Sequence, residues 1–169
     1  MKGSENMITI YTDGAVSGNG KEDAYGGWGF VCVENGRTSW GPVRNATNQR
    51  CELIGVINAC VYAKALLMEK DASAFPPETV EICSDSAYII NCYKQNWYKS
   101  WLNNGWVNSK KEPVANKELW RMLIPFFENP QFSFKKVVGH SGDEYNELAD
   151  KLANKGKAEA KEWRNLLNG

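Results

Sequence analysis

Four carboxylates and one histidine are the side chains of this sequence best placed to do chemistry. Asp13 and Asp85 each follow a short apolar run, Glu52 opens an amphipathic segment, Asp150 lies near the end of the chain, and His140 is the only histidine. An unpaired carboxylate beside an apolar strand is costly to desolvate, and a cation would relieve that cost. Oxygen ligands without a histidine or thiolate cluster are typical of Mg²⁺ or Mn²⁺ sites. The acids therefore predict a site for a hard divalent cation.

Each of these residues also has an ordinary structural interpretation when it is taken alone. The pair Asp13-Gly14 is a common turn signal, Glu52 suits the start of a helix, Asp85 is a good helix N-cap, and Asp150 could be a solvated helix charge. The metal-site hypothesis requires that the four acids meet at one place.

The elements that must position these acids are strands at the start of the chain and helices later. A β-rich run over 7–12, closed by Asp13-Gly14, is followed by two strands within 26–43 around the hairpin signal Asn35-Gly36. Apolar residues at helical spacing predict a helix over 51–70. We further expect strands over 79–84 and 132–138. Helices are expected after a cap at Asp85 or Ser86 through 95, from about 117 towards 127, and from 144 to about 159. This order predicts an α/β fold with a mixed five-stranded sheet, its first three strands antiparallel, flanked by helices.

Length and composition favour one globular domain over residues 1–169. Hydrophobic residues make up 43% and charged residues 24%, which are ordinary values for a globular protein. Twenty basic residues balance twenty acidic residues, so a nucleic-acid partner would have to be held by a local patch.

The five cysteines and the N-terminus indicate a cytoplasmic protein. The cysteines stand among apolar residues without a CxxC pair, which predicts buried reduced thiols rather than a zinc site. We identify no signal peptide and no apolar run of the roughly 18 residues that a membrane span needs. We therefore expect a soluble protein without a membrane partner.

Five segments, which contain all four acids and His140, together carry a family resemblance: YTDGA at 11–15, TNQRCEL at 47–53, SDSAYII at 84–90, NGW at 104–106 and GHSGDEYNELAD at 139–150. In their order and spacing they resemble the type 1 ribonuclease H family, whose members cut the RNA strand of RNA/DNA hybrids. The resemblance implies the ribonuclease H fold in a single catalytic domain. It also implies that Asp13, Glu52, Asp85 and Asp150 bind two Mg²⁺ ions when substrate is present, with Mn²⁺ possible, and that the products carry 5′-phosphate and 3′-hydroxyl ends.

The chemistry implied by this resemblance needs several acids at one point. Two cations about 3.5 to 4 Å apart can activate water and stabilise the departing 3′ oxygen, and their mutual repulsion calls for several anionic ligands. His140, with an ordinary pKa of about 6.5, would assist proton transfer or product departure, unless it is a surface histidine in a turn. Glu147 would tune the site electrostatically, or be a solvated charge.

The resemblance also suggests which residues hold a hybrid, the expected partner. Asn19, Asn48 and Gln49 would read 2′-hydroxyls in the minor groove, a task that Glu52 could share. Both asparagines could equally be loop amides. Trp97 and Trp101 lie four apart and, by their polar neighbours, are expected to face outward against the DNA strand, although core packing competes. Thr47 and Asn116 resemble residues that grip a DNA phosphate.

Some positions depart from the family pattern. The arginine that usually accompanies the phosphate grip would fall at Asn45, and Asn103 and Asn104 stand where many members carry lysines and arginines. Fewer phosphate contacts should mean weaker binding and a shallower salt dependence. We expect a monomer without a separate hybrid-binding domain.

Two other classes of protein are alternatives to the nuclease. DNA transposases and integrases share the fold, but the glutamate in the first helix and the histidine loop argue against them. A non-catalytic nucleic-acid binding module would keep the platform without needing all four acids.

Overall fold

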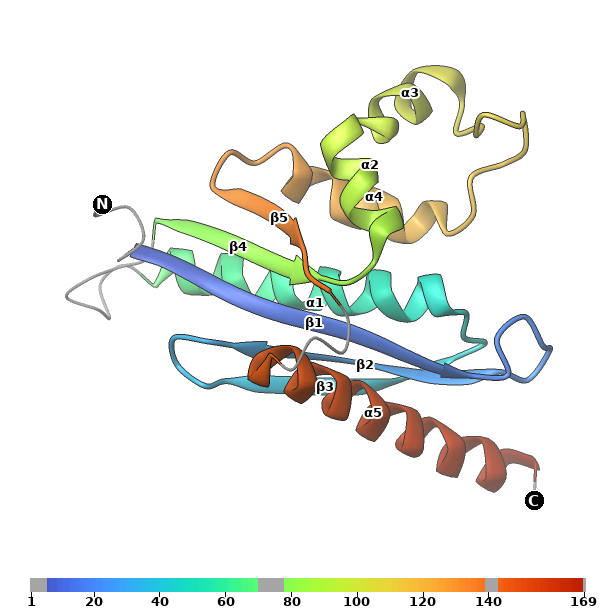
Figure 1. Cartoon of the computed structure of the whole chain (residues 1–169). Helices are drawn as coiled ribbons and strands as arrows, with labels where there is room; N and C mark the ends of the chain where they lie inside the picture. The colour runs from blue at the N-terminus through green and yellow to red at the C-terminus, as the bar shows by residue number, and fades with distance from the viewer. Residues whose placement is uncertain (1–5, 70–77, 139–142, 169) are drawn as a thin grey trace.

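The computed structural model describes residues 6–69, 78–138 and 143–168. Their elements follow one another along the chain as β1 (Met7–Ser17), β2 (Tyr25–Cys32), β3 (Thr38–Arg44), α1 (Asn48–Met68), β4 (Thr79–Ser84), α2 (Ala87–Gln95), α3 (Trp97–Asn104), α4 (Lys117–Phe127), β5 (Phe132–Lys136) and α5 (Glu144–Asn168) (Figure 1).

One five-stranded sheet, in the order β3-β2-β1-β4-β5, forms the centre of the fold. β1, β2 and β3 pair antiparallel, whereas β4 pairs parallel with both β1 and β5. The mixed sheet with an antiparallel start is therefore confirmed. The hairpin signal is confirmed as well, because Gly36 adopts a φ of 72° between β2 and β3, a conformation that glycine adopts without steric cost.

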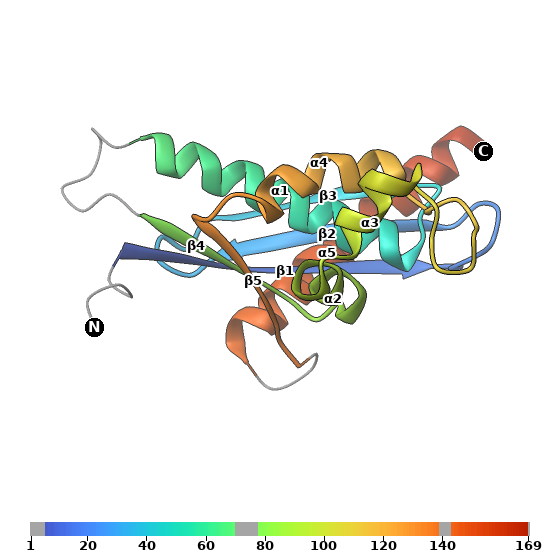
Figure 2. The ribbon, with the colours of Figure 1, turned by 90° about the horizontal axis from the view of Figure 1, so that it is seen from above.

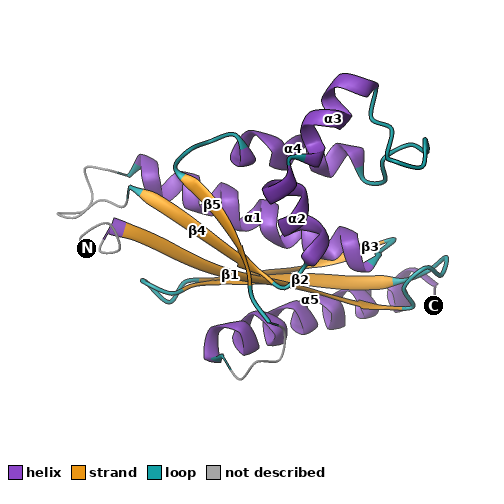
Figure 3. Ribbon diagram, turned by 45° about the horizontal axis from the view of Figure 1, so that its top comes forward, coloured by secondary structure: helices purple, strands orange, loops and turns teal. Residues whose placement is uncertain are grey.

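The helices lie in layers on the two faces of the sheet. α1 and α4 lie on one face and α5 on the other (Figure 3), and the view from above shows α2 and α3 beside α4 (Figure 2). The main core forms between α1, the sheet and the three middle helices, and it includes Leu53, Ile82 and Trp120. Alternate residues of β1, such as Ile8 and Ile10, enter this core as strand geometry requires.

Several boundaries differ from the sequence-based expectation. β1 does not end at Asp13-Gly14 but continues to Ser17, paired with β2 throughout. β5 ends at Lys136, two residues early. α5 runs to Asn168 instead of 159, because Ala160 is still buried and Arg164 still contacts Tyr25. Packing against the sheet, which local sequence does not reveal, extends both β1 and α5.

α1 is long enough and apolar enough, by length and composition alone, to span a membrane. The sequence-based expectation of no such segment missed this. More than half of its apolar stretch is buried inside the protein, and Leu53, Val56 and Ile57 lie in the core. Contact with the sheet therefore accounts for the apolar composition of α1.

The cysteines behave as the sequence predicted. All five are free and buried. Burial raises the pKa of Cys51, Cys83 and Cys92 to about 12, so these thiols stay protonated and unreactive at neutral pH.

Glycines let α5 lie unusually close to β2 and β3. A Cβ on Gly27 would stand 2.2 Å from the backbone nitrogen of Lys157 and 2.3 Å from the carbonyl oxygen of Ala153. A Cβ on Gly156 would stand 2.2 Å from the carbonyl oxygen of Gly41. The obstacles are backbone atoms, so neither contact can be relieved by a rotamer change.

Replacing Gly27 with alanine should therefore destabilise the protein. We expect Gly27→Ala to lower the free energy of unfolding by about 3 kcal/mol or more, the upper end of what overpacking costs elsewhere, measured by urea denaturation. Gly20→Ala is the control, because nothing lies within 4 Å of its Cβ position; only its φ of 82° should cost about 1 kcal/mol. Equal losses in the two variants would contradict the close packing of α5.

Candidate active site

The acidic site forms where β4 leaves the sheet. β1 and β4 run parallel and are paired from Met7 and Thr79 to Tyr11 and Cys83. Asp85 directly follows the end of β4, and Asp13 lies two residues beyond the last paired position on β1. Both acids thus lie just beyond the carboxyl end of the parallel pairing between β1 and β4. This is the edge at which α/β sheets bind ligands.

Helix α1 delivers Glu52 to the same place. Thr47 caps the helix by accepting a hydrogen bond from the Arg50 N–H at 3.1 Å. A Cβ on Gly14 would stand 2.7 Å from the carbonyl carbon of Cys51 and from the backbone nitrogen of Glu52. Gly14 therefore permits close contact between β1 and the first turns of α1. The expectation that Asp13-Gly14 forms a turn is wrong: this glycine provides room for a helix in mid-strand.

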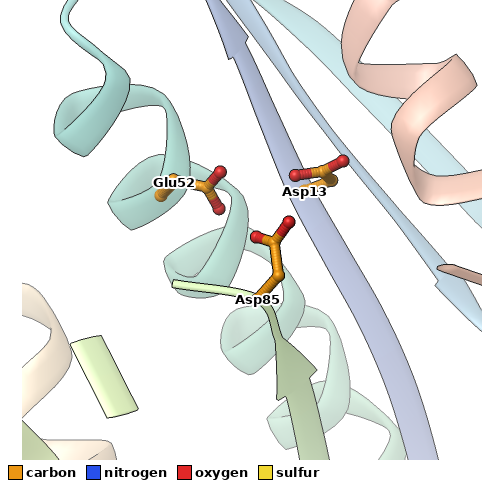
Figure 4. A group of neighbouring side chains, drawn as sticks. All are labelled: Asp13, Glu52 and Asp85. Carbon is orange, nitrogen blue, oxygen red and sulfur yellow. The ribbon is translucent and has the colours of Figure 1, made fainter. Parts of the chain in front are cut away.

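Three carboxylates meet at this point. One oxygen each from Asp13, Glu52 and Asp85 lies within 4.8 Å of the others (Figure 4). Asp13 is 7% exposed and Glu52 is 6% exposed, although they line a cavity. Oε2 of Glu52 is buried without a hydrogen-bond partner among the described residues. An orphaned buried oxygen beside two more carboxylates fits a hard divalent cation, which would satisfy all three.

Confinement raises the proton affinity of these acids. Burial, and next the charge of Asp85, raise the pKa of Asp13 to about 7, although the Gly14 N–H donates to its Oδ1 at 2.8 Å. The pKa of Glu52 is held well above its ordinary value by burial and then by the charges of Asp13 and Asp85. Shifts of this kind mark functional acids, and a bound cation would reverse them.

Asp150 approaches Asp13 from the opposite face of the sheet. It lies on α5, and its carboxylate contributes to the raised pKa of Asp13 through a hydrogen bond and through its charge. Its Oδ1 accepts a hydrogen bond from Asn154 at 3.4 Å. The four predicted acids are thus brought together around a cavity of about 410 Å³ that is lined by Asp13, Gly14, Asn48, Glu52, Asp85, Ser86, Ala87, Tyr88 and Asp150.

Of the expected minor-groove residues, Asn48 lines this cavity, Asn19 contacts Asn48, and Gln49 follows Asn48 in α1. Oδ1 of Asn19, on the β1–β2 loop, accepts a hydrogen bond from the Asn48 N–H at 3.0 Å, which ties the loop to the start of α1. Asn116 donates to Oε1 of Gln49 at 2.9 Å, and Gln49 stands one helical turn before Glu52. A single network of amides therefore connects the β1–β2 loop, α1 and the start of α4.

Arg50 belongs to this network, and the sequence reading missed it. Its guanidinium donates to Oδ1 of Asn116 at 3.0 Å and pairs with Glu118 at 3.1 Å. Asn45, where an arginine was expected by resemblance, is exposed and adopts a φ of 49°. The signal was present in the sequence, because Arg50 stands three residues after Thr47 and so lies beside this cap.

One of the two tryptophans is placed differently from the expectation. Trp101 is 5% exposed and packs edge-on against Trp120 at 5.2 Å, so the prediction that it faces outward is wrong. Core packing outweighs its polar neighbours. Trp97 is partly buried and meets the ring of Tyr88 edge-on at 5.4 Å. Tyr88, also missed by the sequence reading, is 40% exposed and lines the acidic cavity.

His140 lies outside the described residues, but the structure describes the residues on either side, up to Val138 and from Asp143. Asn146 donates from its side chain to the carbonyl oxygen of Val138 at 3.2 Å. Asp143 accepts from the Tyr145 N–H at 2.9 Å, at the start of α5. Glu147 is exposed and lines a small cavity together with Asp13, Asp85, Asn146 and Asp150.

Comparison with known proteins gives a consistent result. The family model described as RNase H matches residues 5–158. A protein named Ribonuclease H from Syntrophomonas wolfei is 44% identical over 148 residues, covering 86% of this chain and 92% of its own. A Ribonuclease H from Clostridium botulinum is 42% identical over 149 residues, covering 87% and 93%.

Solved structures show the same fold. A type 1 RNase H with the type 2 active-site motif superposes with a TM-score of 0.67 at 24% identity, covering 92% of this chain and 74% of that one. The foamy viral protease-reverse transcriptase in complex with RNA/DNA hybrid gives a TM-score of 0.70 at 23% identity, covering 93% of this chain and 21% of that one.

The raised pKa of Asp13 predicts how the stability of the metal-free protein depends on pH. A carboxyl that binds its proton more tightly when folded stabilises the fold below its unfolded pKa of 3.8, and this contribution is lost as the pH rises through about 7. In chelator, we expect the free energy of unfolding of the wild type to fall by on the order of 2–4 kcal/mol across that pH window, relative to that of Asp13→Asn. Urea denaturation at several pH values measures this difference.

The exposed Asp23 provides the control for this measurement. Asp23→Asn removes one carboxylate from the β1–β2 loop and should leave the pH dependence as in the wild type. If Asp13→Asn also followed the wild type at every pH, the proposed confinement of Asp13 would be wrong.

Proposed function

This chain belongs to the RNase H family, and on that premise we propose that it hydrolyses the RNA strand of RNA/DNA hybrids to leave 5′-phosphate and 3′-hydroxyl ends. The observation that carries the proposal is the convergence of Asp13, Glu52 and Asp85, whose oxygens lie within 4.8 Å of one another. Carboxylates confined together in this way destabilise the fold unless their charge is compensated. Their convergence at an open cavity therefore indicates a functional site.

The four acids Asp13, Glu52, Asp85 and Asp150 would hold two divalent cations, Mg²⁺ or alternatively Mn²⁺. When bound, these cations supply an activated water and stabilise the charge that develops on the leaving oxygen. The carboxylates supply the compensating negative charge. Glu52, fixed by its burial and by the close approach of α1 to β1, keeps the cluster from spreading when substrate binds.

The amide network would recognise the RNA strand. Asn48 lines the acidic cavity, Asn19 contacts Asn48, and Gln49 follows it in α1. These three residues would exchange hydrogen bonds with 2′-hydroxyls in the minor groove. Since Asn48 lines the cavity itself, a ribose that it contacts would carry a phosphate close to the acids. Recognition of the ribose and position of the cut are thereby linked.

The DNA strand would lie on the other side of the network. Thr47 and Asn116 are the proposed phosphate grip, and Arg50 supplies the positive charge that Asn45 lacks. Trp97 offers a partly exposed ring for a sugar or base. Trp101 would contribute from below, where it packs against Trp120 and Trp106 and supports the surface.

Two residues near the start of α5 are proposed as helpers. His140 would take or give a proton during hydrolysis or product departure, since an imidazole titrates near neutral pH. Glu147 would tune the field at the acids, because it lines the same small cavity as Asp13 and Asp85. We further propose that the chain acts as a monomeric single domain in the cytoplasm, a reducing compartment that suits its five free thiols.

The proposal is tested by incubating the protein with a labelled RNA/DNA hybrid, with Mg²⁺ and with excess chelator. We expect cutting of the RNA strand only with metal, and no cutting of matched double-stranded RNA or DNA. End-labelling of the products reads the predicted 5′-phosphate. An intact hybrid in the presence of Mg²⁺ or Mn²⁺ would overturn the proposal.

Asp85→Asn separates binding from catalysis. It keeps the size of the side chain and removes one charge from the acid cluster, so the cutting rate should fall by at least about 10²–10³-fold, while the affinity for the hybrid in chelator, measured by fluorescence anisotropy, should persist. Asp23→Asn, which removes an exposed charge on the β1–β2 loop, is the control. Unchanged cutting by Asp85→Asn would remove Asp85 from the mechanism.

A further inference from the structure

Two cations of α4 lie over the ring of one tryptophan. The Nζ atom of Lys117 is 5.6 Å from the centre of the Trp106 ring, and the guanidinium carbon of Arg121 is 5.5 Å from it. Lys117 and Arg121 are four residues apart and so share one helical face. We call Lys117 and Arg121 the cation pair on Trp106.

The charge of this pair is not neutralised within the protein. Across the described ranges 6–69, 78–138 and 143–168, the two ion pairs join Arg50 to Glu118 and Arg164 to Asp23. Neither includes Lys117 or Arg121. Like charges at this spacing cost an isolated helix about 0.2–0.5 kcal/mol, and Lys117 also opposes the dipole at the start of α4. A bound anion would remove both penalties.

Trp106 is held firmly enough to fix both cations. It is buried at 8% exposure and adopts a φ of 66°, which is rare for a bulky residue. Its N–H donates to the carbonyl oxygen of Trp101 at 2.9 Å, and its own carbonyl accepts from the Val114 N–H at 2.9 Å. A fixed ring restrains the two long side chains before any ligand binds, which lowers the entropic cost of binding.

The pair lies next to the proposed phosphate grip. Asn116 directly precedes Lys117, and its side chain donates to Gln49 on α1, one turn before Glu52. The polar groups of the neighbouring loop are engaged with their own backbone: Asn104 bonds to the N–H and the carbonyl of Val107, and Asn108 accepts from the N–H groups of Lys110 and Glu112. The cation pair therefore provides free positive charge beside Asn116.

We propose that Lys117 and Arg121 bind phosphates of the DNA strand of the hybrid, next to the phosphate gripped by Thr47 and Asn116. This inference rests on the proposed function. The substrate is a polyanion, and the protein as a whole has no net charge, so affinity must come from local cations. On α4 these cations are placed in advance by one indole ring, and neither forms an ion pair with a carboxylate of the described residues.

The test is the salt dependence of hybrid binding by the double variant Lys117→Gln, Arg121→Gln. Binding to a labelled hybrid in chelator is followed by fluorescence anisotropy at several salt concentrations. Loss of two phosphate contacts should reduce the slope of log affinity against log salt by about 2. At about 0.1 M salt the corresponding loss is up to about eightfold in affinity for each contact. Arg121 is exposed and Lys117 is partly buried, so circular dichroism checks that the variant folds.

A matched double variant controls for the change in net charge. Arg37→Gln, Lys64→Gln removes two exposed positive charges from the β2–β3 turn and from the outer face of α1, and it should keep the wild-type slope. Equal slopes for the wild type and the Lys117→Gln, Arg121→Gln variant would overturn the inference. If the wild type still cuts the hybrid in that case, the proposed function stands. If the wild type neither binds nor cuts it, the proposed function fails, and this inference fails with it.

A hybrid with a neutral DNA backbone tests the strand assignment. When methylphosphonates replace the DNA phosphates, the wild type and the Lys117→Gln, Arg121→Gln variant should bind with the same salt slope, because the contacts that distinguish them are gone. A difference that persists on this hybrid would show that the two cations do not contact the DNA strand, and would overturn the proposal.

Discussion

Repulsion among confined carboxylates is the constraint on which the rest of this structure depends. At an effective dielectric constant of about 20, two unit charges about 5 Å apart repel by about 3 kcal/mol, and burial adds a desolvation cost. Asp13 and Glu52 experience both burial and the charge of Asp85, which is why their proton affinities are raised. Left to itself, such a cluster would spread, so the backbone must hold it until a cation binds.

The scaffold holds the cluster by bringing backbones closer together than side chains normally allow. Gly14 lets the first turns of α1 lie against β1, and Gly27 and Gly156 let α5 lie against β2 and β3. Glu52 and Asp150 therefore reach Asp13 from opposite faces of the sheet. The cost of the confined charge is offset by the apolar core beneath α1, where Leu53 and Val56 are fully buried, so the apolar composition of α1 is part of how the site is kept.

Periodicity and turn chemistry were enough to predict most of the fold, because they report local geometry. The range of β4 agrees with the expectation residue for residue, and α4 lies where a helix was expected. The errors arose where tertiary contact overrides local signals: β1 continues through Asp13-Gly14 because α1 and β2 pack there, and Trp101 turns inward because Trp120 provides a partner. The four acids could be named by resemblance, but their proximity and the part played by Arg50 depend on distances between elements that no local pattern contains.

Acidic and basic side chains occupy separate places on this protein, which has no net charge. A local group of cations could therefore attract a polyanion. A phosphate entering the acidic cavity without cations would meet three or four carboxylates, so the site itself repels its substrate until those charges are compensated. Attraction must then come from elsewhere on the surface, within the screening length of about 8–10 Å at physiological salt. Lys117 and Arg121 lie over Trp106, and the bond of Asn116 to Gln49 connects the start of α4 with the helix that carries Glu52. Arg50, which pairs with Glu118, donates to the same Asn116. On the proposed function, the cations would draw the DNA strand to α4 while the acids would remain available for metal.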